Sequence, residues 1–137
     1  MKIYISGGIT KVGVENARRT FDEYERVLGN VLGCEVLNPM KAVPQKEGKG
    51  WWYYMVRLLP KVVQCDEIYM MPNWGESRGA RLERIVAMLF GLEVRYAKLR
   101  GMEDGNVVLI VSHSPIVDDY KPDDFNNNNN TSDGLVY

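Results

Sequence analysis

The chain has 137 residues, 45% hydrophobic and 26% charged, which fits one globular domain with a single sheet and a few helices. Its net charge is −1. Residues 118–137 hold five Asp and one Lys, or −4, so residues 1–117 carry +3. Such a weakly basic body argues against a large nucleic-acid-binding surface, and no apolar run approaches the length that spans a membrane.

The two cysteines, Cys34 and Cys65, form no disulfide framework and have no His or Cys partner at metal-ligand spacing. We therefore expect buried free thiols, no metal and a reducing compartment. Met1 leads directly into an apolar strand pattern without a signal peptide, so a cytoplasmic protein is expected.

The hydrophobic pattern predicts strands and helices that alternate along the chain. In chain order it predicts a strand over residues 2–6, a helix over 14–31, a strand over 34–37, a mobile loop over 40–50, a helix over 51–64, a strand over 66–71, a helix from Ser77 to near Gly91, and strands over 93–97 and 106–111. Pro60 is expected to kink or shorten the second helix.

This alternation predicts an α/β fold, a three-layer α/β/α sandwich of the Rossmann or flavodoxin type with a mainly parallel sheet of four or five strands. The predicted domain covers residues 1–117. The acidic, Asn-rich residues 118–137 lack periodicity and are expected to be a flexible tail.

In open α/β sheets, ligands bind at the carboxyl ends of the strands. Three loops rich in Gly, Asn and Ser fall there. Their candidate ligand-binding residues are Ser6, Gly7, Gly8, Ile9, Asn38, Asn73 and Trp74. The glycines allow the backbone to approach a ligand closely.

The segment Ser77–Glu83 enters the third predicted helix, where free backbone N–H groups attract anions. Ser77 and Gly79 are therefore candidates for anion binding, although Ser77 alone is also a good N-cap. Glu83 lies on the second turn as a candidate catalytic carboxylate, and a solvated surface residue is the alternative. Tyr4 and Ser6 share one face of the first strand, so Tyr4 is expected to reach and orient Glu83 through a hydrogen bond.

Other chemically notable residues have plainer interpretations. The aromatic run 51–54 is expected to pack alternate members in the core, and the others favour a subunit interface over stacking on a nucleobase. Asp66 is interpreted as a structural hydrogen-bonding group. His113 lies outside any triad spacing, and the glycines match neither a phosphate-binding nor a dinucleotide-binding fingerprint.

Taken together, these segments resemble the nucleoside 2-deoxyribosyltransferase-like superfamily, with the nearest branch in the small proteins of the DUF4406 group. The resemblance covers roughly residues 1–97, and its last block is the most specific. The matching residues are Lys2–Thr10, Asn16, Phe21, Val36–Pro39, Cys65–Met71, Trp74–Glu83, Ala87 and Gly91.

The resemblance implies a nucleoside or nucleotide as substrate, with no cofactor. The glutamate at the position of Glu83 is the nucleophile that attacks the anomeric carbon and releases the base, in transfer or in hydrolysis. A serine and a glycine at the positions of Ser77 and Gly79 bind the 5′-phosphate in nucleotide-hydrolase relatives, and the first-strand tyrosine matches Tyr4. A homodimer or larger homo-oligomer is also implied.

This sequence departs from that pattern at two places. Leu58 stands where relatives usually carry an aspartate that helps protonate the leaving base or holds the sugar, and the first loop has Gly8 and Thr10 in place of a proline and an arginine. Since a general acid supplies about 10²–10⁴-fold in rate, a catalytically weak nucleotide-binding module is the alternative. A purely structural role, based on the aromatic run and the tail, is the third hypothesis.

Overall fold

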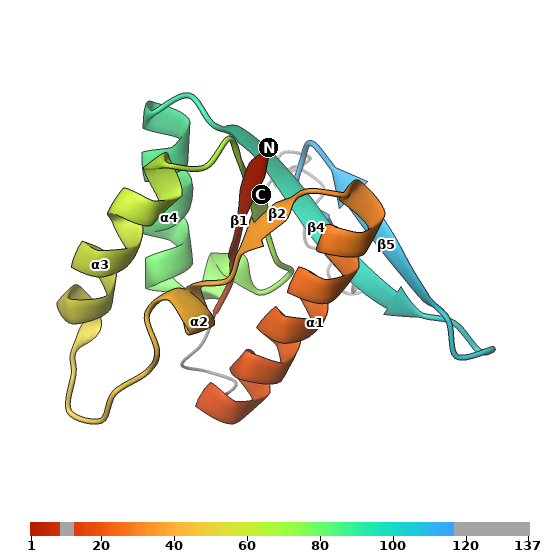
Figure 1. The fold of residues 1–137 in the computed structure, drawn as a ribbon, viewed down its shortest axis with the longest axis horizontal. Helices are drawn as coiled ribbons and strands as arrows, with labels where there is room; N and C mark the ends of the chain where they lie inside the picture. The colour runs from red at the N-terminus through yellow and green to blue at the C-terminus, as the bar shows by residue number, and fades with distance from the viewer. Residues whose placement is uncertain (9–12, 117–137) are drawn as a thin grey trace, which may run out of the picture.

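The computed structural model describes residues 1–8 and 13–116, which form one five-stranded sheet covered by helices (Figure 1). The strands are β1 (Lys2–Ser6), β2 (Glu35–Leu37), β3 (Glu67–Met70), β4 (Glu93–Gly101) and β5 (Val107–Ser112). Their order is β2-β1-β3-β4-β5. The first four run parallel, and β5 pairs antiparallel to β4. The predicted mainly parallel α/β sheet is therefore confirmed.

Helices lie on both faces of this sheet, as expected for parallel strands joined by crossover connections (Figure 1). The helices are α1 (Val14–Leu32), α2 (Pro39–Ala42), α3 (Trp51–Val63) and α4 (Arg78–Leu89), with a short 3₁₀ turn η1 (Trp74–Glu76) before α4. α1 and α2 cover one face, whereas α3 and α4 pack against each other on the other face. The three-layer arrangement follows the prediction.

The alternation of side chains along β1 divides the core into two halves. Ile3 and Ile5 pack with Phe21 and other residues of α1. Tyr4 points to the opposite side, into the cluster that α3 and α4 cover. All of β1 except Lys2 is fully buried, so its carboxyl end lies deep in the molecule.

Capping residues hold the ends of several elements. Ser77 is the N-cap of α4, where its hydroxyl accepts a hydrogen bond from the Ala80 N–H at 3.1 Å. Gly33 ends α1 with φ of 64°, a conformation that favours glycine. Asp66 accepts a hydrogen bond from the Lys2 N–H at 2.9 Å, which confirms its structural role.

Some local predictions were wrong. Residues 39–42 form α2 at the start of the predicted loop, because Asn38 caps this helix, Pro39 suits its first turn and Met40 is buried. α3 spans nearly the predicted residues, so Pro60 does not shorten it, and β4 extends beyond its predicted end to Gly101 because it pairs with β5 over six residue pairs.

The two cysteines are free thiols, but only Cys65 is buried, and burial raises its pKa to about 11. Cys34 is half-buried, so the expectation of two buried thiols holds for one of them. The described helices include none with the length and apolar character required to cross a membrane. The predicted tail, and Ile9 and Thr10, lie outside the described residues.

Candidate functional site

Glu83 is a buried carboxylate on the inner face of α4, with only 5% of its surface exposed. Its position follows from the helix geometry: Ala80, Glu83 and Ala87 recur every three or four residues and form the buried side of α4. The alternative interpretation of Glu83 as a solvated surface residue is therefore wrong.

Two hydroxyl groups from β1 hold both oxygens of this carboxylate. The Tyr4 hydroxyl donates to Oε2 at 2.6 Å, and the Ser6 hydroxyl donates to Oε1 at 2.6 Å. Both residues are fully buried, and both point toward α4 because residues two positions apart on a strand lie on the same face. The predicted hydrogen bond from Tyr4 is present, and Ser6 supplies a second one.

Burial and hydrogen bonding act in opposite directions on Glu83. Burial raises its pKa from 4.5 to about 7, although the hydrogen bonds from Ser6 and Tyr4 favour the charged form. The pKa of Tyr4 is raised well above its usual value, by burial first and then by the nearby Glu83 charge. Tyr4 therefore remains a hydrogen-bond donor at neutral pH.

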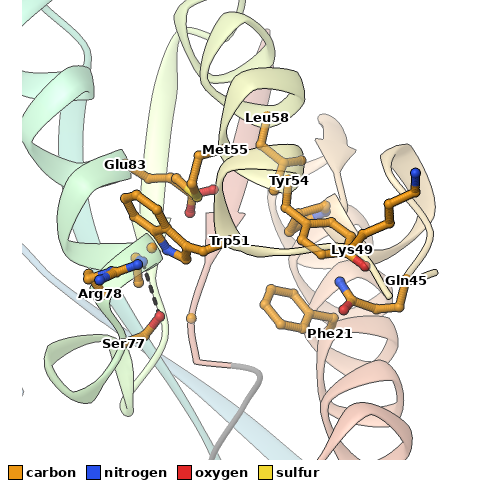
Figure 2. Close-up of a pocket in the computed structure, with 14 residues that line it drawn as sticks. Phe21, Gln45, Lys49, Trp51, Tyr54, Met55, Leu58, Ser77, Arg78 and Glu83 are labelled. Atoms are coloured by element: carbon orange, nitrogen blue, oxygen red, sulfur yellow. Dashed lines mark hydrogen bonds between the residues drawn. The ribbon is translucent and has the colours of Figure 1, made fainter. Parts of the chain in front are cut away.

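Glu83 lines a cavity of about 450 Å³ between α1, α3 and the start of α4 (Figure 2). This volume lies within the range of about 300–1,000 Å³ that is typical of small-molecule sites. The other lining residues are Gly7, Phe21, Pro39, Gln45, Lys49, Trp51, Tyr54, Met55, Leu58, Ser77, Arg78, Gly79 and Ala80. The carboxylate is thus buried within the protein but accessible from a cavity of ligand size.

The start of α4 and the start of α3 meet at one end of this cavity. The guanidinium of Arg78 stacks over the Trp51 ring at 4.0 Å from its centroid. A Cβ added to Gly79 would lie 3.3 Å from the Met55 sulfur and 3.5 Å from Trp51 Nε1, so glycine permits the two helices to approach closely. Trp51 Nε1 is buried and has no hydrogen-bond partner among the described residues.

The loop after β1 is fixed by the loop after β3. The Gly8 N–H donates to Asn73 Oδ1 at 3.1 Å, and Asn73 Nδ2 donates back to the Gly8 carbonyl at 3.4 Å. A Cβ on Gly7 would lie 3.1 Å from Asn73 Oδ1 and from Met71. Gly7 lines the cavity, whereas Asn73 acts on the site through the loop that it holds.

Six of the predicted site residues in the described part of the chain do not line the cavity. Tyr4 and Ser6 bind Glu83, Gly8 and Asn73 bind each other, and Asn38 and Trp74 are engaged elsewhere. Asn38 is buried, accepts a hydrogen bond from the Met40 N–H at 3.0 Å and donates to Asp22 and Glu25, so its polar groups are engaged by α1 and α2. Trp74 packs against Tyr96, with ring centroids 5.8 Å apart.

The aromatic side chains of residues 51–54, at the start of α3, pack differently from the prediction. Trp51 and Tyr54 are half-buried and line the cavity, while Trp52 is 67% exposed. None of the four aromatic residues belongs to the buried core, because a helix does not alternate its side chains between two faces as a strand does.

Sequence reasoning did not select several cavity residues. Phe21 was named only among the residues that match the family, and Gln45 and Lys49 lie in a segment without periodicity. The lysine and glycine content of that segment gave no indication of which side chain would face a ligand. Arg78 lies inside the segment Ser77–Glu83, so among these residues it had the clearest sequence signal.

Comparisons with known proteins identify a family for most of the chain. The family described as "Domain of unknown function (DUF4406)" matches residues 1–96. Among solved structures, one match is a 2-deoxyribosyltransferase from the psychrotolerant bacterium Bacillus psychrosaccharolyticus, at 19% identity and a TM-score of 0.49, covering 69% of each chain. No curated protein matches.

Proposed function

The chain belongs to the DUF4406 family, and we propose that it cleaves the N-glycosidic bond of a nucleoside or nucleotide, as a hydrolase or a 2-deoxyribosyltransferase, with Glu83 as nucleophile. The observation that carries the proposal is the Glu83 carboxylate itself. It is 5% exposed, held by two hydroxyl groups at 2.6 Å, and lines a cavity of about 450 Å³. The sequence resemblance supplies the reaction class.

In the first step, one oxygen of Glu83 attacks the anomeric carbon while the bond from that carbon to the base nitrogen breaks. The base leaves with the electron pair of that bond and takes up a proton from solvent. In the second step, water or a second base attacks the same carbon and frees the carboxylate, as in retaining glycosidases. The reaction invokes no metal and no organic cofactor.

Tyr4 and Ser6 support this reaction by orienting the carboxylate. Each Glu83 oxygen accepts one hydrogen bond and keeps further acceptor capacity, so a lone pair remains for the sugar carbon. Their donation also favours the ionised form against the effect of burial. We therefore propose that Tyr4 acts with Glu83 as part of the catalytic group, and that Ser6 holds the other oxygen of the same carboxylate.

The remaining lining of the cavity suits a nucleotide. Phe21, Trp51 and Tyr54 offer aromatic surface for a base or sugar, and Lys49 and Arg78 offer positive charge for an anionic group. The backbone N–H groups at the start of α4, near Ser77 and Gly79, add anion-binding capacity. We propose that Gly7 and Gly8 bring the first loop close to the same ligand.

The test is base release from a panel of 2′-deoxynucleosides and their 5′-monophosphates, followed by chromatography. Glu83→Gln keeps the size of the side chain and removes the nucleophile, so we expect base release to stop. Glu67→Gln is the matched control, since Glu67 is a half-buried glutamate whose side chain is 16% exposed. Full turnover by Glu83→Gln, with a folded protein, would refute the proposal.

Leu58 favours a second candidate, a nucleotide-binding module without efficient catalysis. It lines the cavity, is only 6% exposed, and cannot donate a proton to a leaving base. Under this alternative, the panel binds in calorimetry and releases no base. Leu58→Asp is then expected to confer base release, while the similarly shaped Leu58→Asn is not.

We also propose that the protein forms a homo-oligomer in the cytoplasm. α3 and α4 expose large apolar side chains, notably Trp52 at 67%, Val56 at 61% and Leu89 at 77%. Light scattering during size exclusion measures the assembly, and Trp52→Lys is expected to weaken it. A monomeric wild-type protein at micromolar concentration would contradict this proposal.

A further inference from the structure

We infer that Tyr54 is a positioning residue, whose hydroxyl fixes the segment from Gln45 to Lys49 at the mouth of the cavity so that it is ready to receive the ligand. The inference rests on the proposed function for the identity of that ligand. It concerns a residue whose hydroxyl does not touch Glu83 and takes no part in the chemical steps above.

The Tyr54 hydroxyl binds both backbone groups of one residue. It accepts a hydrogen bond from the Lys46 N–H at 2.9 Å and donates to the Lys46 carbonyl at 2.8 Å. Since Tyr54 belongs to α3, these two bonds attach the segment to a regular helix. The phenol ring also lines the cavity, so the attachment point is part of the cavity wall.

The segment carries two cavity residues on either side of this attachment. The Lys49 N–H donates to the Lys46 carbonyl at 3.3 Å and closes a turn, while the Lys49 ammonium lies 5.0 Å from the centroid of the Tyr53 ring. Gln45 directly precedes Lys46. Figure 2 shows Gln45, Lys49 and Tyr54 gathered at one end of the cavity, with Ser77 and Arg78 at the other.

This segment has little else to order it. It lies between α2 and α3, and residues 46–50 are exposed. A segment that is not fixed beforehand must lose conformational entropy when the ligand binds, which weakens affinity. By holding Lys46, Tyr54 places the amide of Gln45 and the charge of Lys49 before binding.

Tyr54→Phe tests this directly, because it removes the hydroxyl and keeps the ring. Tyr53→Phe is the matched control, since the Tyr53 hydroxyl makes no hydrogen bond among the described residues and its ring would still face Lys49. We expect amide hydrogen exchange in residues 45–49 to accelerate about 5-fold or more in Tyr54→Phe and to stay unchanged in Tyr53→Phe. Unchanged exchange in Tyr54→Phe would overturn the inference.

Binding of 2′-deoxyadenosine 5′-monophosphate supplies the second measurement, made by calorimetry in the Glu83→Gln background to prevent turnover. We expect Tyr54→Phe to weaken binding about 3- to 10-fold. The loss should shrink when Lys49→Gln is also present, because part of the effect acts through Lys49. If Tyr54→Phe weakens nucleotide binding just as much when Lys49→Gln is present, the role assigned to the segment is overturned.

The two proposals fail in different ways. If the wild-type protein releases no base and binds no nucleotide, the proposed function is wrong, whereas accelerated exchange in Tyr54→Phe would still support the positioning of the segment. If exchange is unchanged while the wild-type protein releases base, the proposed function stands and the role of Tyr54 is wrong.

Discussion

Removing the Tyr4 hydroxyl is expected to move the activity of this protein to higher pH. The pKa of Glu83 is about 7, because burial raises it while the hydrogen bonds from Ser6 and Tyr4 lower it. Tyr4→Phe leaves the carboxylate buried and removes one of the two donors. With burial unchanged and one donor fewer, the protonated form of Glu83 is favoured, and this form cannot act as a nucleophile.

The size of the effect follows from the strength of the lost interaction. A hydrogen bond to a charged group is worth about 1.5–3 kcal/mol, and about 1.4 kcal/mol corresponds to a tenfold change in an equilibrium. The ratio of ionised to protonated Glu83 should therefore fall at least about tenfold. At pH 7, close to the pKa of Glu83, kcat/KM should drop by a similar order, and it should recover as the pH rises.

The assay is the pH profile of kcat/KM for the best substrate of the panel, over pH 5 to 10. Tyr24→Phe is the control, since Tyr24 is a buried tyrosine on the opposite face of the sheet. The reasoning would be refuted if the acidic limb of the kcat/KM profile stayed at the same pH in Tyr4→Phe. A shift of equal size in Tyr24→Phe would refute it as well.

Three further predictions concern stability, measured by chemical denaturation. The pKa of Glu83 is about 7 when folded, against an ordinary 4.5, so the folded state retains a proton that the unfolded state loses. The free energy of unfolding should fall by about 3 kcal/mol from pH 4.5 to 7, relative to Glu83→Gln, and a parallel pH dependence in both proteins would contradict this. Ser77→Ala removes the N-cap of α4 and should cost about 1 kcal/mol, with an unchanged midpoint as the opposing result. Gly7→Ala adds a Cβ 3.1 Å from Asn73 Oδ1 and should cost about 1–3 kcal/mol, whereas Gly75→Ala meets nothing within 4 Å and should cost much less.

The pairing of Tyr4 with Glu83 could be predicted because it depends on two regular periodicities. Alternation in β1 places Tyr4 and Ser6 on one face, and the helical repeat of α4 places Glu83 on its buried side. The parallel sheet followed from the same alternation of strands and helices. That alternation also predicts a ligand site at the carboxyl ends of the strands, where Gly7, Pro39 and Ser77 line the cavity. Most of the fold therefore depends on local patterns that a single sequence displays.

The rest of the cavity could not be predicted, because it depends on segments that lack a period. Lys49 and Gln45 reach the cavity through a turn that Tyr54 holds across eight residues of sequence. Asn38 looked like a ligand-binding residue, yet Asp22 and Glu25 of α1 engage its side chain. Such contacts between distant segments decide which polar side chains remain available for a ligand.

The most direct test of the central claim is mass spectrometry of the protein quenched during turnover of a 2′-deoxynucleoside. The account predicts a deoxyribosyl adduct on the peptide that contains Glu83, present in the wild-type protein and absent in Glu83→Gln. The account would be contradicted by a deoxyribosyl adduct on another residue during base release. Undiminished base release by Glu83→Gln would contradict it as well.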